Sequence, residues 1–315
     1  MTPHLSWIGR RLLLGLGQTA AVVLFIFALT EALPGDAAVA LAGDQPDPAR
    51  IDRIRETMGL DRPAAARLTD WVVSLLHGDL GTSLISGRPV TGYLTAGLGP
   101  TLLLATATLT LLTPLSVGLG VLAARREGGP LDRTVSALTL AVHAVPEFAV
   151  GVLLATLFGL WLGWLPPTAV GADPFTQPAV LILPVVVLLS RPVCTISRLV
   201  RAGMIEAMAS PYVAQARRYG VSGTRITWTH ALPNAIAPAT QQLARTCDWL
   251  LSGVIVVEAL FVIPGLGTVL IEAVAARDIP VVQGMAVVFG IVTVLVNLAA
   301  DLAARRFAPR SEVAA

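Results

Sequence analysis

The sequence predicts an all-α, polytopic integral membrane protein with six transmembrane helices. Of its 315 residues, 55% are hydrophobic and only 13% are charged, and the mean hydropathy is +0.74. A soluble chain would carry about 25% charged residues. The apolar residues also come in long blocks instead of alternating with polar ones, and each block approaches the roughly 20 residues that a helix needs to cross a bilayer.

The apolar blocks give six spans. The predicted spans are Leu12–Leu33, Thr101–Ala123, Val135–Leu160, Ala179–Leu199, Leu243–Val262 and Val281–Ala304. The first span follows Arg10 and Arg11, as the apolar part of a signal peptide would. It is too long for a cleaved signal, however, and no small-residue cleavage site clearly follows, so we expect it to be retained. Cys194 and Cys247 both fall inside predicted spans, which argues against a disulfide framework.

The arginines predict the orientation, because cytoplasmic loops of membrane proteins carry the excess of positive charge. Two arginines precede the first span, three follow the second span, five lie in or beside the loop 203–238, and three follow the last span. The segment 161–178 has none and the segment 264–280 has one. Both termini and the loop 203–238 are therefore expected in the cytoplasm. The long segment 34–99 carries six arginines, but segments of this length translocate largely regardless of charge.

This division gives four parts of the chain: 1–33 as the cytoplasmic N-terminus and first span, 34–99 as an external helical segment, 100–308 as a core with five spans, and 309–315 as a cytoplasmic tail. Within the external segment, one helix is expected to start at Asp47-Pro48 and close at Gly59. A second is expected to start at Pro63 and end at Gly78.

The loop 203–238 has more local signals than a simple connection needs. Ser210 is placed to cap a helix that starts with the following proline and runs to Tyr219. Gly220 stands where a left-handed residue after a helix is wanted. A second short helix is expected over Thr224–Ala231, ended by Leu232-Pro233.

Motifs for catalysis, metal binding and nucleotide binding are absent from the sequence. It contains no GxxxxGK[ST] phosphate loop, HExxH, GxSxG or CxxC. Its four histidines are scattered without metal-ligand spacing, and the arginines do not form a basic stripe with aromatics, as a nucleic-acid surface would. We expect neither an enzyme nor a nucleic-acid-binding protein, and no metal site.

The loop resembles the cytoplasmic loop of ABC importer permease subunits. That family's pattern is EAA, three residues, Gly, nine residues, Ile, one residue and Leu-Pro. Here the register is Ala214-Gln215-Ala216, Gly220, His230 and Leu232-Pro233. Two positions depart, because Ala214 replaces the glutamate and His230 replaces the isoleucine. Glu206 lies eight residues out of register and is not the motif glutamate.

Further motifs resemble the dipeptide, oligopeptide and nickel branch of that family, in particular its B-type subunit with a long loop after the first span. In chain order they are Pro34-Gly35-Asp36, Met58-Gly59-Leu60-Asp61, Gly78-Asp79-Leu80-Gly81, Leu131-Asp132-Arg133, Pro146-Glu147-Phe148, Leu162-Gly163-Trp164, Glu258, Pro264-Gly265-Leu266-Gly267 and Arg277-Asp278-Ile279-Pro280. The resemblance covers nearly the whole chain.

The resemblance implies a type I ABC importer permease in a prokaryotic cytoplasmic (inner) membrane. The implied partners are a second homologous permease, two ATP-binding subunits, an external substrate-binding protein and membrane lipid. ATP and Mg would be bound by the ATPase partners, and this chain would bind no cofactor. The implied cargo is di- or oligopeptides, with nickel or another small solute as the alternative. The residues expected to couple the chain to the ATPases are Tyr212, Val213, Ala214, Gln215, Ala216, Arg217, Arg218, Gly220, His230, Leu232 and Pro233.

Ionisable residues within or near span ends are candidates for the pathway or its gate, because such groups are costly in the membrane. They are Arg191, Arg245, Asp248 and Glu258, and the turn at Pro264-Gly265 is added to them. Asp248 is placed to pair with Arg245 on its own helix or with Arg191 across two spans. An arginine that reaches the interface, beside a local ion pair, is the simpler alternative. Two other classes remain open from sequence: a secondary transporter, although no inverted repeat is visible, and a membrane subunit without transport activity.

Overall fold

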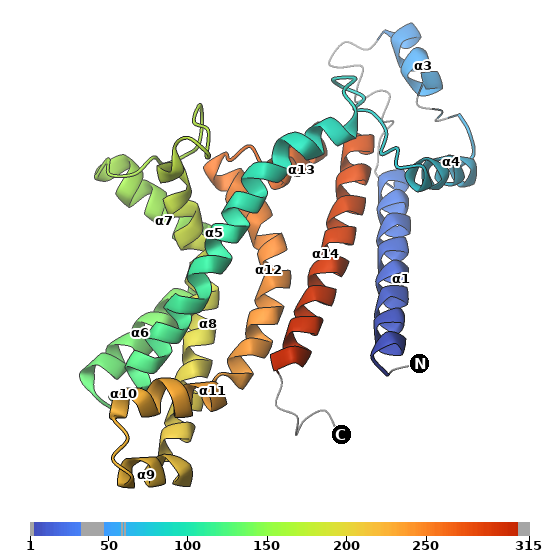
Figure 1. Ribbon diagram of the computed structural model, residues 1–315. Helices are drawn as coiled ribbons and strands as arrows, with labels where there is room; N and C mark the ends of the chain where they lie inside the picture. The colour runs from blue at the N-terminus through green and yellow to red at the C-terminus, as the bar shows by residue number, and fades with distance from the viewer. Residues whose placement is uncertain (1–2, 33–46, 58, 60, 308–315) are drawn as a thin grey trace. The chain divides into compact units, whose positions relative to one another are not determined.

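The computed structural model describes residues 3–32, 47–57, 59 and 61–307, and these residues form two compact units. Within the described residues the secondary structure is helical, apart from an isolated bridge between Thr82 and Pro89. Among these described residues, four helices are long and apolar enough to cross a membrane, and the number rises to six if each of two bent helix pairs is one span (Figure 1). The all-α, polytopic fold predicted from the sequence is confirmed.

The first unit comprises residues 1–99 and 264–295. Its elements are α1 (Pro3–Ala32), α3 (Pro48–Thr57), α4 (Ala64–Leu76), the beginning of α5 (Val90–Ala124), α13 (Leu266–Ala275) and most of α14 (Ile279–Phe307). A small core joins α5, α13 and α14 through Val90, Leu266, Ala273, Val281 and Met285.

The helices predicted in the external segment are present. α3 begins at Pro48, and the Asp47 carboxylate accepts a hydrogen bond from the backbone N–H of Ala49 at 3.1 Å. Gly59 and Gly78 follow α3 and α4 in left-handed conformations, with φ of +61° and +79°. The left-handed backbone explains why glycine stands at both ends.

α4 packs on α1 through an aromatic contact and an ion pair. The rings of Phe27 and Trp71 are stacked with their centroids 6.2 Å apart. One helical turn before Trp71 on α4, Arg67 Nη2 lies 2.6 Å from Glu31 Oε2. The external segment is thereby attached to the end of the first span.

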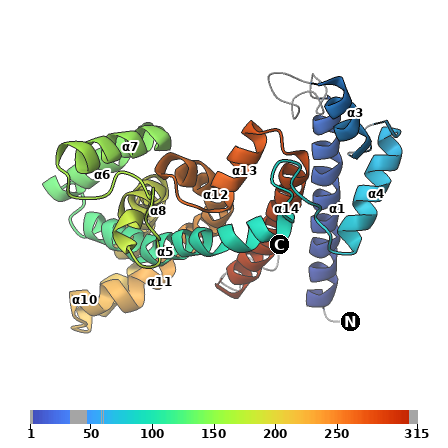
Figure 2. The ribbon, with the colours of Figure 1, turned by 90° about the horizontal axis from the view of Figure 1, so that it is seen from above.

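The second unit comprises residues 100–263 and the chain from 296 onward. Its further elements are α6 (Pro130–Ala144), α7 (Glu147–Leu154), η1 (Ala155–Trp161), η2 (Pro178–Leu181), α8 (Ile182–Ala209), α9 (Pro211–Arg218), α10 (Gly223–Arg225), η3 (Ile226–Ala231), α11 (Leu232–Ala235) and α12 (Ala237–Phe261). α8 is the central helix of this unit: α5, α6, α7 and α12 surround it in Figure 2. Its buried side chains form much of the larger hydrophobic core.

The close packing of α5 on α8 depends on a glycine. A Cβ placed on Gly120 would lie 2.6 Å from the carbonyl oxygen of Ser197 and 2.7 Å from Cβ of Val200. No larger residue fits there without displacing the backbone of α8, so the two helices approach each other at this point.

The third span differs from the straight helix predicted over Val135–Leu160. α6 ends at Ala144, α7 begins at Glu147, and their axes differ by 104°. Val145 is extended, with φ −88° and ψ 132°, because the ring of Pro146 disfavours a helical conformation in the residue before it. The proline was visible in the sequence, and this rule predicts the bend.

Several helices begin before the predicted start of their span, among them α5 and α12. α5 begins at Val90 and continues through Pro100 and Pro114, since helices in membrane proteins tolerate proline when neighbouring groups satisfy the freed backbone. α12 begins at Ala237 and ends where Val262 turns left-handed with φ +53°.

Candidate functional site

The loop 203–238 starts with the last turns of α8 and leads into α9. Ser210 separates the two helices with an extended backbone, at φ −69° and ψ 152°, and Pro211 is the first residue of α9. The hydroxyl of Ser210 donates to the carbonyl oxygen of Ala207 at 2.5 Å, so it does not accept from the N–H groups of α9. The position of the helix start is confirmed, and the side-chain cap predicted for Ser210 is wrong.

α9 ends in a hydrogen-bonded turn that requires Gly220. This residue is left-handed, with φ +78°. Its N–H donates to the carbonyl of Arg217 at 3.0 Å, and the N–H of Val221 donates to the carbonyl of Ala216 at 3.1 Å. This pair of bonds is the Schellman motif, which satisfies carbonyls that a helix end leaves open. The left-handed role predicted for Gly220 is confirmed.

One side of α9 packs inward and the other is exposed. Val213 is fully buried, and Ala216 is half-buried. The side chains open to solvent are those of Tyr212, Ala214, Gln215, Arg217 and Arg218. The exposed side carries two cationic groups and a phenol, together with the small Ala214 in place of the family's glutamate.

The return segment of the loop is one continuous helical stretch, from Gly223 through α10, η3 and α11 to Ala235. The predicted stop at Leu232-Pro233 is therefore wrong. η3 is a π-helical turn that ends at Ala231, and Pro233 is the second residue after it. A π turn already departs from the regular i→i−4 pattern, so the N–H that proline lacks is not missed as it would be inside a regular helix.

One side-chain contact attaches α9 to the return segment, and a second braces that contact from within the return segment. Asn234 Nδ2 donates to the hydroxyl of Tyr212 at 3.3 Å and to the carbonyl of His230 at 2.8 Å. His230 and Pro233 are exposed, whereas Leu232 is half-buried. α9 lies beyond the lower end of α8 in Figure 1, with α10 and α11 above α9, and the predicted coupling residues are all in this part of the second unit.

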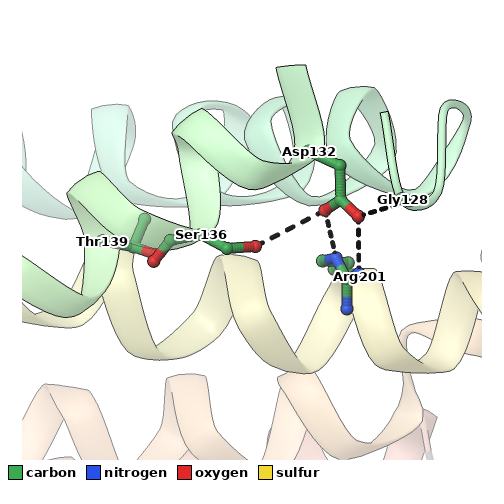
Figure 3. A network of polar contacts seen from close by, with 5 residues as sticks. All are labelled: Gly128, Asp132, Ser136, Thr139 and Arg201. Atoms are coloured by element: carbon green, nitrogen blue, oxygen red, sulfur yellow. Dashed lines mark hydrogen bonds and ion pairs between the residues drawn. The ribbon is translucent and has the colours of Figure 1, made fainter. Parts of the chain in front are cut away.

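At the base of the loop, α8 and α11 are in backbone contact. A Cβ on Gly203 would meet the backbone of Ala235, which leaves space only for glycine. Two residues earlier on α8, Arg201 forms an ion pair with Asp132 at the start of α6 (Figure 3). Sequence reasoning missed this pair, because 69 positions separate the two residues; Asp132 drew attention only as part of a motif.

Glu258 is the most deeply placed of the predicted pathway residues. Its side chain is fully buried in α12, and its Oε1 accepts a hydrogen bond from Thr101 Oγ1 of α5 at 2.6 Å. This contact joins two helices of the second unit inside the membrane-spanning region.

The other predicted pathway residues lie at separate places. Arg191 is half-exposed, and its Nη1 lies 3.9 Å from Glu147 Oε1, an acidic partner that the sequence did not indicate. Arg245 is exposed, and the side chain of Asp248 lies outside the described residues, so neither pairing predicted for Asp248 is tested.

The turn at Pro264-Gly265 belongs to the first unit. Pro264 is exposed there, while Gly265 is buried and precedes α13. A Cβ on Gly97 of α5 would lie 3.0 Å from the carbonyl carbon of Gly265, so this turn is tightly packed. Over the side chains that the structure describes, no group of three or more His, Cys, Asp or Glu could hold a metal ion.

Comparison with known families identifies two matching regions. Residues 116–313 match the family described as binding-protein-dependent transport system inner membrane component. Residues 5–94 match the N-terminal part of a binding-protein-dependent transport system membrane component.

Individual proteins are similar over most of the chain. A peptide transport system permease protein of Brucella abortus (strain 2308) is 35% identical, over 89% of this chain and 90% of its own. The glutathione transport system permease protein GsiC of Pectobacterium atrosepticum is 34% identical, over 92% of this chain and 94% of its own. Among solved structures, an inward-facing MetNI methionine ABC transporter matches with a TM-score of 0.53 and 19% identity, over 70% of this chain and 98% of that chain. This last match concerns the fold alone.

Proposed function

We propose that this chain, which belongs to the family of binding-protein-dependent transport system inner membrane components, imports short peptides together with a second homologous permease. The chain is a permease subunit of an ATP-driven importer in the inner membrane. In this proposal an external binding protein delivers the cargo and two ATPase subunits drive its passage. Family membership favours ATP-driven import over the secondary transporter that the sequence left open.

The observation that carries the proposal is the form of the loop 203–238. α9 is a short helix with one side packed inward and the other exposed, closed by its own Schellman motif and attached to α11 through Tyr212 and Asn234. Such a helix is suited to lie in a groove on an ATPase. Ala214 offers no charge there, so docking would depend on shape and on Arg217 and Arg218.

Movement of the docked helix would supply the transport step. When the ATPase pair closes on ATP, α9 would be displaced as a rigid element, and α8 and α12 would follow because they are directly joined to the loop. The permease pair would then change between outward-open and inward-open states. ATP and Mg would be bound by the ATPases; this chain would supply neither a nucleotide site nor a catalytic site.

The cargo follows from the relatives. Proteins named for peptide and for glutathione transport are about equally similar to this chain, and glutathione is itself a tripeptide. Short peptides are thus the cargo class that both names share. Nickel or another small solute remains the alternative outcome of a cargo test.

The topology that accompanies this function has both termini and the loop 203–238 in the cytoplasm and residues 34–99 outside. The arginine distribution supports it. Labelling of single cysteines from outside intact cells tests it: a cysteine in the segment 34–99 should react and one in the loop should not.

The test of function is assembly followed by transport. The tagged chain, expressed with the genes that neighbour it, should co-purify with a second permease and two ATPases. After reconstitution into liposomes with the binding protein, it should take up trialanine or glutathione only when ATP is present on the ATPase side. Purification without any ATPase, or uptake that is independent of ATP, would contradict the proposal.

The variant Gly220→Pro tests the loop itself. Proline cannot adopt φ +78° and has no N–H to donate to Arg217. Import should be lost while the protein still inserts into the membrane. The matched control is Gly223→Ala in the same loop, where an added Cβ meets nothing within 4 Å. Normal import by the Gly220 variant would rule out this loop as the coupling element.

A further inference from the structure

Asp132 and Arg201 form an ion pair between the first turn of α6 and the lower part of α8, in which the carboxylate is buried and the arginine is partly exposed (Figure 3). Arg201 donates from Nε to Oδ1 at 2.5 Å and from Nη2 to Oδ2 at 2.7 Å, a two-point contact that fixes orientation as well as distance. The Gly128 backbone N–H donates to Oδ2 at 2.9 Å, and the Ser136 hydroxyl lies 3.4 Å from Oδ1. The carboxylate therefore joins the α5–α6 turn, α6 and α8.

Stability is a weak explanation for such a pair. The side chain of Asp132 is 4% exposed and that of Arg201 is 29% exposed, so both charges lose hydration on folding. Apolar side chains of similar volume often hold two elements together at least as well as a buried ion pair. The two-point contact adds a fixed angle between α6 and α8, which apolar contacts do not impose.

The position of the pair on α8 is specific. On one side of it, α8 packs against Gly120 of α5 through Ser197 and Val200. On the other side, Gly203 touches the backbone of Ala235 in α11. Three neighbouring helices thus meet α8 within about two turns. From Arg201, α8 continues for eight residues, about 12 Å, to its end just before Ser210, which connects it to α9.

We propose that Asp132 is a positioning residue for coupling: it holds α6 to α8 so that a displacement of the loop 203–238 moves α5 and α6 together with α8. This inference rests on the proposed function. The contact at Gly120 is close packing without a side-chain hydrogen bond, whereas the bidentate ion pair also fixes the orientation of α6 on α8. Without the carboxylate, a push on α9 would be absorbed by a shift of α8 relative to α6.

The inference predicts uncoupling. In a complex with Asp132→Asn, the ATPases still dock and hydrolyse ATP, because α9 and its exposed side are unchanged. The membrane helices follow α9 less completely, so fewer solute molecules are imported per ATP. Arg201→Lys keeps the positive charge but cannot make the same two-point contact, and it should fall between wild type and Asp132→Asn.

The experiment uses the complete complex of both permeases, both ATPases and the binding protein in liposomes. ATP hydrolysis and uptake of trialanine or glutathione are measured together, per assembled complex. We expect the ATP consumed per solute to rise by about tenfold in Asp132→Asn, within the range of typical coupling energies. The matched control is Asp70→Asn, which removes the exposed Arg62–Asp70 pair in the external segment and should leave this ratio unchanged.

A wild-type ratio in both Asp132→Asn and Arg201→Lys would overturn the inference. So would a variant that assembles in lower amount but imports normally per assembled complex, because the pair would then serve folding alone. Failure of the unaltered complex to assemble, or to import with ATP, would instead contradict the proposed function that the inference rests on.

Discussion

Replacing Gly120 by alanine should destabilise the second unit, although alanine is the better helix former. In the interior of a helix the change from glycine to alanine is worth about 1 kcal/mol in favour of alanine. At this position the new Cβ would lie 2.6 Å from the Ser197 carbonyl oxygen and 2.7 Å from Cβ of Val200. Overpacking of this kind costs about 1–3 kcal/mol, and a backbone carbonyl cannot rotate away. We expect a net loss of up to about 2 kcal/mol.

Gly118 provides the control within the same helix. An alanine Cβ there meets nothing within 4 Å, so only the gain in helix propensity remains. Thermal unfolding of the detergent-solubilised protein should place Gly120→Ala below wild type by about 2–4 °C for each kcal/mol lost. Gly118→Ala should unfold at or above the wild-type temperature. Equal unfolding midpoints for the two variants would refute the packing argument, because both variants replace a glycine by alanine in the same helix.

Three further outcomes follow from local geometry. Gly220→Ala should cost about 1–2 kcal/mol from left-handed strain and weaken co-purification of the ATPases, while Gly223→Ala should not; equal ATPase recovery would contradict this. Thr101→Val should lower thermal stability by about 1–3 kcal/mol, since it removes the hydrogen bond to the buried Glu258; an unchanged midpoint would contradict it. Asp70→Asn should change stability by less than about 1 kcal/mol, because its ion pair is exposed; a loss above about 2 kcal/mol would contradict that reasoning.

Features set by local backbone chemistry were predictable from the sequence. Gly59 and Gly78 follow the ends of their helices as expected, Gly220 is left-handed as expected, and Pro48 and Pro211 begin helices. In each case the residue type itself restricts φ or supplies the one conformation that the turn requires. These predictions need no knowledge of the rest of the chain.

Two expectations failed at prolines: the span expected over Val135–Leu160 took no account of Pro146, and the stop expected at Leu232-Pro233 is absent. Pro146 bends the third span by 104°, which a hydropathy window cannot detect, whereas Pro233 continues a helix because a π turn precedes it. Hydropathy reports how many apolar residues follow one another and says nothing of the direction that the backbone takes.

The side-chain partners were the least predictable part of the candidate site. Arg191 lies near Glu147, and Arg201 pairs with Asp132. Each partnership depends on how α6 and α7 pack against α8, which no spacing along the chain encodes. The arginine distribution predicted an orientation, yet it could not reveal that one of these arginines is bound between helices.

The closed end of α9 has a consequence for the kinetics of assembly. Because the N–H groups of Gly220 and Val221 already donate to carbonyls of the helix, α9 needs no partner to complete the hydrogen bonds of its C-terminal end. An ATPase would therefore meet a preorganised ligand, and the binding free energy would not be reduced by the conformational entropy of folding a disordered segment. Differences in affinity among related ATPases should then appear mainly in their dissociation rates.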